Sequence, residues 1–209
     1  MTSRKYHSPR RSDLAAQTRD VILNSACALF LERGYAGVTI GEIAQAANVA
    51  VPTVYSSAGS KSAILLALLE PALTEPAIAE HLAAVTTSED PCEVIELTAR
   101  GTRLAHERHW DLVYGLFYRD PPGELAVKTV LDRGADDFVQ ALTHVAARLG
   151  ALDSLPDEVD EAEALDVLWF HFGPHAWTTL VGQRSWSFDR AQAWTTRAAT
   201  RALSLRCRD

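Results

Sequence analysis

The stretch that decides the fold runs from Thr39 to Ser57 and reads TIGEIAQAANVAVPTVYSS. Thr39 and Glu42 form the S/T-x-x-E pattern of a capping box, which begins a short helix. Asn48 tolerates the left-handed backbone of a tight turn better than most residues. Pro52 falls in the first turn of the next helix, where a missing N–H has no consequence. Two short helices joined by a tight turn predict a helix-turn-helix.

Helices are also expected on both sides of this motif. An apolar face predicts a first helix over 13–33, ended by Gly34, and another helix from Ser60 through Leu69. Pro71 and Pro76 are expected to end that helix. Alternating strand patterns are absent, and five further helices are expected over 91–107, 108–119, 123–149, 160–182 and 189–206. The predicted fold class is therefore all-α, with a small three-helix N-terminal domain over 1–59 joined by a connecting helix to a helical domain over 60–209.

Charge is distributed unevenly along the chain. The net charge is -7, which by itself argues against a nucleic-acid partner. Residues 1–61, however, hold seven Lys or Arg and four Asp or Glu, whereas residues 62–209 hold thirteen and twenty-three. Four basic residues lie in the first twelve positions, with no acid among them: Arg4, Lys5, Arg10 and Arg11. A basic N-terminal region on an acidic chain indicates nucleic-acid contact, although a short solvated tail has the same composition.

Other features of the sequence argue against several classes of protein. No apolar run approaches the roughly 18 residues that cross a bilayer, and no signal peptide is visible, so we expect a cytoplasmic protein without a membrane partner. Cys27, Cys92 and Cys207 are odd in number and widely spaced, so we expect reduced thiols and no disulfide framework or zinc site. No cofactor is expected.

Two residues near the motif are placed to hold phosphates. Tyr55 ends the second short helix, where its hydroxyl would reach a DNA backbone, or where its ring would pack in a core. Lys61 lies in the first turn of the next helix and opposes the helix dipole, a penalty that a bound phosphate would reverse. The alternative for Lys61 is an exposed side chain without a role.

The sequence from Thr18 to Leu65 resembles the N-terminal domain of the TetR family of repressors. The resemblance rests on these residues and their spacing: Thr18-Arg19, Ile22-Leu23, Ala26, Leu29-Phe30, Arg33-Gly34-Tyr35, Val38-Thr39-Ile40, Ile43-Ala44, Ala47 through Tyr55, Ser60-Lys61 and Leu65. It implies an all-helical homodimer whose N-terminal domain binds double-stranded operator DNA. It also implies a C-terminal ligand-binding and dimerisation domain that releases the DNA when a small molecule binds.

The resemblance assigns DNA-binding roles to individual positions. Bases would be met by Val51, Pro52, Thr53, Ser56 and Ser57, the first two through thymine methyl groups. Phosphates would be held by Thr39, Tyr55 and Lys61, with Arg4, Lys5, Arg10 and Arg11 in a basic arm before the first helix. After Tyr55 the chain departs from the family pattern. Ser56-Ser57-Ala58-Gly59 supply no bulky ring against the next helix, which predicts looser support there.

The C-terminal domain contains two clusters of aromatic residues. The first has helical spacing, and the second surrounds Gly173-Pro174, where a proline is expected to kink the helix. We expect an apolar effector pocket, with ordinary core packing as the alternative for each ring. The predicted ligand-binding residues are Trp110, Tyr114, Phe117, Tyr118, Trp169, Phe172, His175 and Trp177. His171 and His175 share a helix face but lack a third ligand, so no metal is expected.

The last helix carries a stripe of small residues with one tryptophan. This stripe predicts a dimer interface formed by Ala191, Trp194, Ala198 and Ala202. The predicted function is a repressor that a small apolar or aromatic effector releases from its operator. No enzyme motif such as GxSxG, a Walker loop or a Rossmann fingerprint is present, so no enzyme is expected. Two alternatives stay open: an all-α ligand carrier or enzyme, and a protein–protein module whose DNA-binding domain is degenerate.

Overall fold

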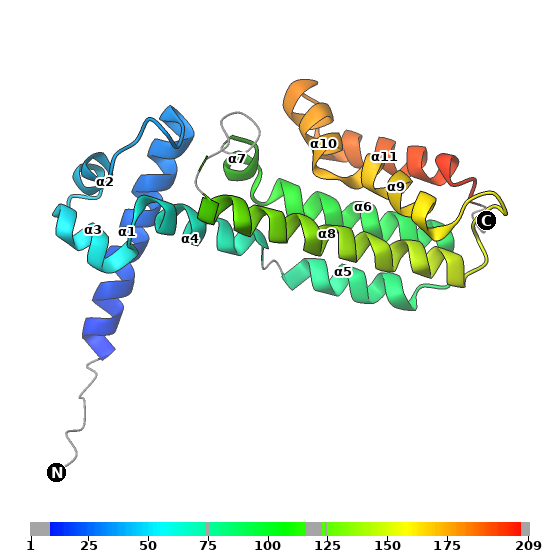
Figure 1. Cartoon of the computed structure of the whole chain (residues 1–209), viewed down its shortest axis with the longest axis horizontal. Helices are drawn as coiled ribbons and strands as arrows, with labels where there is room; N and C mark the ends of the chain where they lie inside the picture. Colours follow the sequence, from blue (N-terminus) through cyan, green and yellow to red (C-terminus); the bar gives the residue numbers. More distant parts are fainter. Residues whose placement is uncertain (1–8, 74–75, 116–122, 124, 206–209) are drawn as a thin grey trace, which may run out of the picture. The chain divides into compact units, whose positions relative to one another are not determined.

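The computed structural model describes residues 9–73, 76–115, 123 and 125–205. Every regular element in these ranges is a helix, which confirms the all-α fold class (Figure 1). The chain divides into two compact units, residues 1–71 with 115–130 and residues 72–114 with 131–209, which we call the head unit and the body unit. The head unit thus includes residues beyond 59, which is the predicted end of the N-terminal domain.

The head unit holds the first four helices: α1 (Pro9–Arg33), α2 (Ile40–Ala46), α3 (Val51–Ala58) and α4 (Lys61–Leu73). The first three pack on one another around fully buried Ile22, Ile43 and Val54. Two expectations are corrected here. The first helix begins at Pro9 rather than near residue 13, and Pro71 lies inside α4 rather than ending it.

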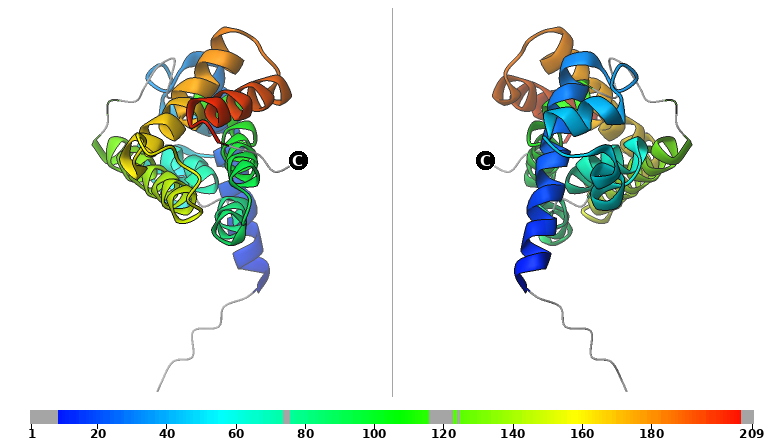
Figure 2. Two further views of the ribbon diagram at one scale, coloured as in Figure 1. Left: turned by 90° about the vertical axis from the view of Figure 1, so that its right-hand side faces the viewer. Right: turned by 90° about the vertical axis from the view of Figure 1, so that its left-hand side faces the viewer.

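The body unit contains the remaining helices, although α8 begins in the head unit. They are α5 (Pro76–Thr87), α6 (Pro91–Glu107), α7 (Trp110–Val113), α8 (Leu125–Ala151), α9 (Glu161–Phe172), α10 (Pro174–Trp177), the π-helix η2 (Thr178–Gln183) and α11 (Phe188–Ala202). Helices α5, α6 and α8 run alongside one another, and Figure 2 views them nearly end-on. Helix α11 packs on α6 and α9.

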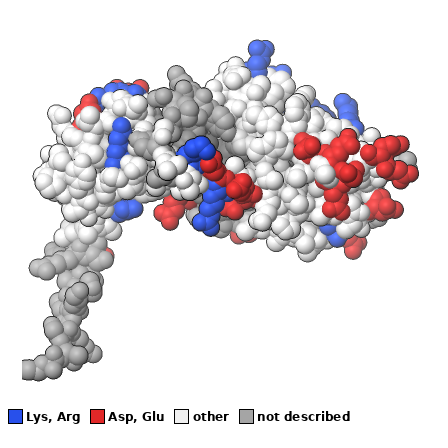
Figure 3. Space-filling model, viewed as in Figure 1, with Lys and Arg blue, Asp and Glu red and all other residues white. Residues whose placement is uncertain are grey.

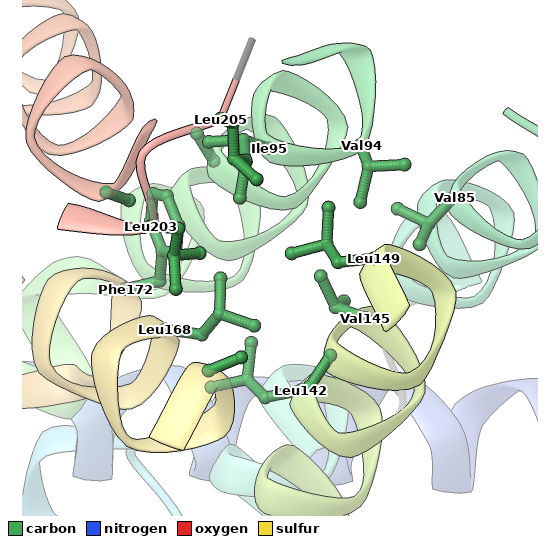
Figure 4. Packing of buried hydrophobic residues seen from close by; sticks show 14 residues of the cluster. Val85, Val94, Ile95, Leu142, Val145, Leu149, Leu168, Phe172, Leu203 and Leu205 are labelled. Carbon is green, nitrogen blue, oxygen red and sulfur yellow. The ribbon is translucent and has the colours of Figure 1, made fainter. Parts of the chain in front are cut away.

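The core of the body unit is built from side chains that are far apart in the sequence. Figure 4 shows Val85, Ile95, Leu149, Phe172 and Leu203 pointing toward a common centre from α5, α6, α8, α9 and the end of α11. All five are at most 2 % exposed. Burial of apolar surface on this scale is the main driving force that holds such helices together.

Three expectations for the body unit are wrong. Helix α5 is not among the predicted helices, because Pro76 reads as a break in the sequence, whereas it occupies the first position of this helix, which proline tolerates. The helix expected over 160–182 ends at Phe172, and Gly173 is extended at ψ 164° before α10 begins at Pro174. The third concerns Cys92, which is disulfide-bonded rather than reduced, whereas Cys27 forms no disulfide; Cys207 lies outside the described residues.

Candidate functional site

Helix α2 begins with the predicted capping box. The backbone N–H of Glu42 donates to Thr39 Oγ1 over 3.3 Å, and the backbone N–H of Thr39 donates to Glu42 Oε2 over 2.8 Å. The Thr39 hydroxyl also donates to Glu42 Oε2, and Arg33 Nη1 lies 2.8 Å from the other carboxylate oxygen. These donors hold the pKa of Glu42 below its ordinary value, with the Thr39 side chain as the largest cause. The start of α2 is therefore fixed by local contacts.

The turn between α2 and α3 depends on Asn48. Its φ of 53° lies in the left-handed region, and its backbone N–H donates to Gln45 O. The next residue, Val49, donates its N–H to Ala44 O over 2.9 Å and so closes the end of α2. Helix α3 then begins without a side-chain cap, because Ala50 stands at the N-cap position. The predicted helix-turn-helix is thus present.

Helix α3 has a buried face and an exposed face. Val54 and Ala58 are buried against the head unit. Val51 and Tyr55 are 40 % and 55 % exposed, and Pro52 and Ser56 are also exposed. Thr53 and Ser57 are half-buried at the edges of this face. The six predicted DNA-contacting residues of α3 therefore form one accessible surface, which we call the α3 face.

Small residues lie at the junction of α3 and α4, where the sequence predicts looser support. Gly59 has φ 84°, and a Cβ added to it would lie 3.0 Å from the Cβ of Ala63. Ala58 is 5 % exposed. Arg19 Nη1 donates to the carbonyl oxygen of Ser57 over 3.4 Å and ties this end of α3 to α1. The junction is held by close backbone approach rather than by a wedge of aromatic rings.

Lys61 occupies the first position of α4. Its Nζ lies 4.3 Å from the centre of the Tyr35 ring and 3.5 Å from the carbonyl oxygen of Ala36. The Ser60 hydroxyl accepts from the backbone N–H of Ala63 and caps the helix. A cation beside the N-terminal N–H groups of a helix is arranged for an anion.

The predicted basic arm falls partly outside the described residues. Arg4 and Lys5 lie in that part of the chain. Arg10 and Arg11 belong to the first turn of α1 rather than to an arm before it.

Five of the predicted ligand-binding residues belong to one series of ring contacts in the body unit: Trp110, Tyr114, Trp169, His175 and Trp177. Trp110 stacks on Tyr114 at 4.7 Å, and Phe188 links Trp110 to Trp177. The series continues from Trp177 through His106, Phe138 and Trp169 to His175. Phe117 and Tyr118 lie outside the described residues. Phe172 and Trp177 are fully buried, and the Trp177 indole N–H donates to Phe172 O over 3.1 Å, so both are also core residues.

A cavity that is open to solvent lies between α5, α6 and α8. None of the six predicted ligand-binding residues that the structure describes is among its lining residues. Its wall is almost wholly apolar and consists of Ile78, His81, Leu82, Val85, Leu97, Thr98, Gly101, Thr102, Ala105, Phe138, Ala141, Leu142 and Val145. The spacing of Ile78, Leu82 and Val85 is that of one apolar helix face. That signal is present in the sequence and predicts both α5 and its wall of the cavity.

His106 lies directly behind this wall. Its Nδ1 is 2.7 Å from the carbonyl oxygen of Thr102, and because a carbonyl only accepts, Nδ1 carries the proton. Its ring stacks on Trp177 and meets Phe138 edge-on. Burial lowers the pKa of His106 to about 4. The hydrogen bond to the Thr102 carbonyl raises the pKa, but this effect is smaller than that of burial. The imidazole is therefore neutral at physiological pH.

The predicted dimer stripe is only partly accessible. Ala191 is fully buried within its own chain and is not available to a second copy, because α11 packs that residue inward. Trp194 is 41 % exposed, Ala202 is exposed and Ala198 is half-buried. On the neighbouring helix α9, Phe170 is 65 % exposed.

An aromatic group surrounds Trp194. His171 lies against its ring at 6.2 Å, and Trp186, covered by the Arg190 guanidinium, meets it edge-on. Nδ1 of His171 is buried without a hydrogen-bond partner. Burial, followed by the charge of His175, lowers the pKa of His171.

Two further findings limit the kinds of site present. No helix among the described residues is long and apolar enough to span a bilayer. In the same part of the chain, no group of three or more His, Cys, Asp or Glu side chains is arranged to hold a metal ion.

Comparison with known proteins identifies the class. Residues 22–68 match the sequence model of bacterial regulatory proteins, tetR family. No curated protein matches the chain. The transcriptional regulator PfmR from Thermus thermophilus, itself assigned to the TetR family, superposes with a TM-score of 0.64 at 22 % identity over 91 % of this chain and 98 % of that one.

Two ligand complexes have the same fold. FadR from Bacillus subtilis, bound to stearoyl-CoA, has a TM-score of 0.66 at 17 % identity and covers 88 % of this chain and 97 % of its own. SmeT bound to triclosan has a TM-score of 0.65 at 19 % identity and covers 89 % and 91 %. The fold is thus that of a helix-turn-helix transcriptional regulator with a C-terminal helical domain. The sequence similarity to the tetR family lies within the head, over residues 22–68.

Proposed function

We propose that the chain is a cytoplasmic repressor that binds operator DNA as a homodimer and releases it when a small apolar molecule occupies the body unit. The observation that carries the proposal is the α3 face, which presents Val51, Pro52, Tyr55 and Ser56 to solvent. Apolar and hydroxyl side chains on one exposed helix face suit base edges and thymine methyl groups in a major groove. Thr39, Tyr55 and Lys61 would then hold phosphates and set the register.

Charge supports the head rather than the body as the DNA-binding part. Figure 3 shows Asp and Glu side chains gathered on the body unit where α8 ends and α9 begins. Residues 151–163 hold six acidic residues and no Lys or Arg. An acidic surface repels DNA, whereas Lys61 beside a helix N-terminus attracts phosphate.

The proposed dimer would use the exposed aromatic surface of α9 and α11. Phe170 and Trp194 are large and apolar, and they lie on two helices that pack together. A two-fold dimer would place two heads about 34–36 Å apart, the spacing of successive major grooves. Phe170→Asp is expected to give monomers in analytical ultracentrifugation and to weaken operator binding.

The proposed effector site is the cavity between α5, α6 and α8, which is apolar, as ligand pockets commonly are. FadR and SmeT each bind a molecule with a large apolar part. An effector would release DNA only to the extent that it binds the released conformation more tightly. The aromatic series from Tyr114 to His175 stays a prediction for further effector contacts.

Mobility-shift titration on the duplex upstream of the chain's own gene tests DNA binding. Lys61→Ala should weaken binding to all sequences alike and reduce the salt slope by about one unit. Arg133→Ala, which removes an exposed positive charge from the body unit, is the matched control. Thr53→Ala should instead alter sequence preference.

Two results would contradict the proposal. Failure of the wild-type protein to bind any duplex at low salt would favour the carrier or the protein–protein module. Turnover of a bound ligand would favour an enzyme.

A further inference from the structure

Among the residues that the structure describes, no charged side chain lines the cavity between α5, α6 and α8. Helix α5 carries Glu80 and His81 but no Lys or Arg. On α6, Arg100 pairs with Glu96, and Arg103 pairs with Glu107 and Asp189. On α8, Arg148 donates twice to the carbonyl oxygen of Ser88. None of these arginines is among the lining residues, and neither are Lys128 and Arg133, the other Lys and Arg of α8.

This arrangement disfavours an anionic effector. A carboxylate that moves from water into an apolar site loses its hydration. Without a cation or hydrogen-bond donors in the site, no interaction compensates for this loss. The body unit as a whole adds repulsion, because its residues 72–114 and 131–209 hold eleven Lys or Arg against twenty Asp or Glu. The same argument applies to a coenzyme A group at the cavity mouth.

The two threonine hydroxyls of the wall can act only as acceptors toward a ligand. Thr98 donates its hydroxyl proton to Val94 O over 2.8 Å, and Thr102 donates to Ala99 O over 3.2 Å. With their protons used, both oxygens keep only lone pairs to offer a ligand. His81, the remaining polar residue, already has an interaction of its own. The two threonine oxygens therefore pair with a hydrogen-bond donor.

We infer that the cavity takes an uncharged apolar molecule bearing one hydroxyl, an aliphatic alcohol or a phenol, whose proton is accepted by Thr98 or Thr102. The inference rests on the proposed function only in calling this molecule the effector. It separates this chain from a regulator of fatty acids or acyl-coenzyme A thioesters. Thr98 and Thr102 become the residues that determine specificity.

Displacement of the neutral dye N-phenyl-1-naphthylamine from the full chain at pH 8 measures the selectivity. The competitors are 1-decanol, 1-methoxydecane, decanoate and decanoyl-coenzyme A, which share an alkyl chain and differ in the head group. Decanol should compete about three- to tenfold better than the ether, the range of one neutral hydrogen bond. Decanoate and the thioester should be at least about tenfold weaker than decanol.

Thr98→Val and Thr102→Val should abolish the preference for decanol over the ether. Thr195→Val is the matched control, since Thr195 is also buried and donates to the carbonyl oxygen four residues earlier, on α11. Equal or tighter binding of decanoate or the thioester would overturn the uncharged class. A preference that survives in both cavity variants would overturn the hydroxyl assignment.

A cavity-filling variant separates this inference from the proposed function. Ala141→Phe should abolish binding of dye and decanol, with thermal unfolding and duplex binding as checks on its fold. Dye and decanol binding that persists in this variant would overturn the cavity as the site. Selective binding of decanol without any change in duplex affinity would support the chemistry of the cavity and contradict its role in releasing DNA.

Discussion

The α3 face of the head and the cavity of the body present opposite kinds of surface. The α3 face comes from one helix of eight residues, and its polar and apolar side chains are exposed to solvent. The cavity wall comes from three helices, extends from Ile78 to Val145, and is almost wholly apolar. The first surface suits a large polar partner such as DNA, and the second suits a small molecule that leaves water. The two proposed functions therefore lie in separate compact units.

Large-to-small substitutions in the core of each unit test whether the two surfaces depend on separate cores. Ile43→Ala in the head and Ile95→Ala in the body each remove a fully buried side chain and should cost about 2–5 kcal/mol of stability. Ile43→Ala should abolish duplex binding at moderate temperature and leave dye binding intact. Ile95→Ala should lower the urea concentration at which half of the dye binding is lost. Parallel urea titrations by mobility shift and dye fluorescence measure both. Simultaneous loss of both activities in each variant would contradict two separate cores.

The body unit contains a buried histidine, His106, behind the wall of its cavity. Because the pKa of His106 falls from 6.5 to about 4 on folding, the unfolded chain binds a proton that the folded chain excludes. The contribution of neutral His106 to the free energy of unfolding is fully present above pH 6.5. The free energy of unfolding should fall by up to about 3 kcal/mol as the pH drops toward 4. Urea unfolding of the body, followed by dye release between pH 7.5 and pH 5, measures the slope.

The control for this pH dependence is another histidine on a helix. His144 makes the same contact with the carbonyl four residues earlier but is exposed. His106→Gln should flatten the slope, and His144→Gln should leave it unchanged. An unaltered slope in His106→Gln would assign the effect to other groups.

In the head, the turn depends on one backbone conformation. Asn48 has φ 53°, which costs an ordinary L-residue about 1–2 kcal/mol. Asn48→Ala should destabilise the head by about that amount, whereas Asn48→Gly should change its stability little, since glycine adopts this conformation freely. Thermal unfolding followed by circular dichroism measures both. Equal losses in the two variants would place the role of Asn48 in its side chain instead.

The sequence predicts the head better than the body for a physical reason. The capping box of Thr39, the turn at Asn48 and the first-turn proline are decided by residues within four positions of one another. The cavity depends on α5, and Pro76 reads as an interruption although proline is favoured at a first helical position. The other walls of the cavity contain Leu97 of α6 and Phe138 of α8, which are far apart in the sequence. Helical periodicity alone does not determine that these two helices pack together.

Burial explains the remaining differences between sequence and structure. The stripe on α11 is helical, as predicted, but which helix face is covered depends on α6 and α9, and Ala191 is internal. Trp177 is predicted to contact a ligand, yet its indole is satisfied by Phe172 O in the core. Helical spacing identifies a face but not the element that packs against it.

The smallest expected effect concerns the start of α2. Thr39→Ala removes a cap worth about 1 kcal/mol, and Thr39→Ser, which keeps the hydroxyl, should retain most of it. The loss should also depend on pH. Because the Thr39 side chain is the largest cause of the lowered pKa of Glu42, this contribution is present above pH 4.5 and is lost as the pH falls through the folded-state value. Urea unfolding of wild type and both variants at pH 7 and pH 3.5 checks this; equal Thr39→Ala losses at both values would show that the hydroxyl acts on the backbone N–H of Glu42 alone.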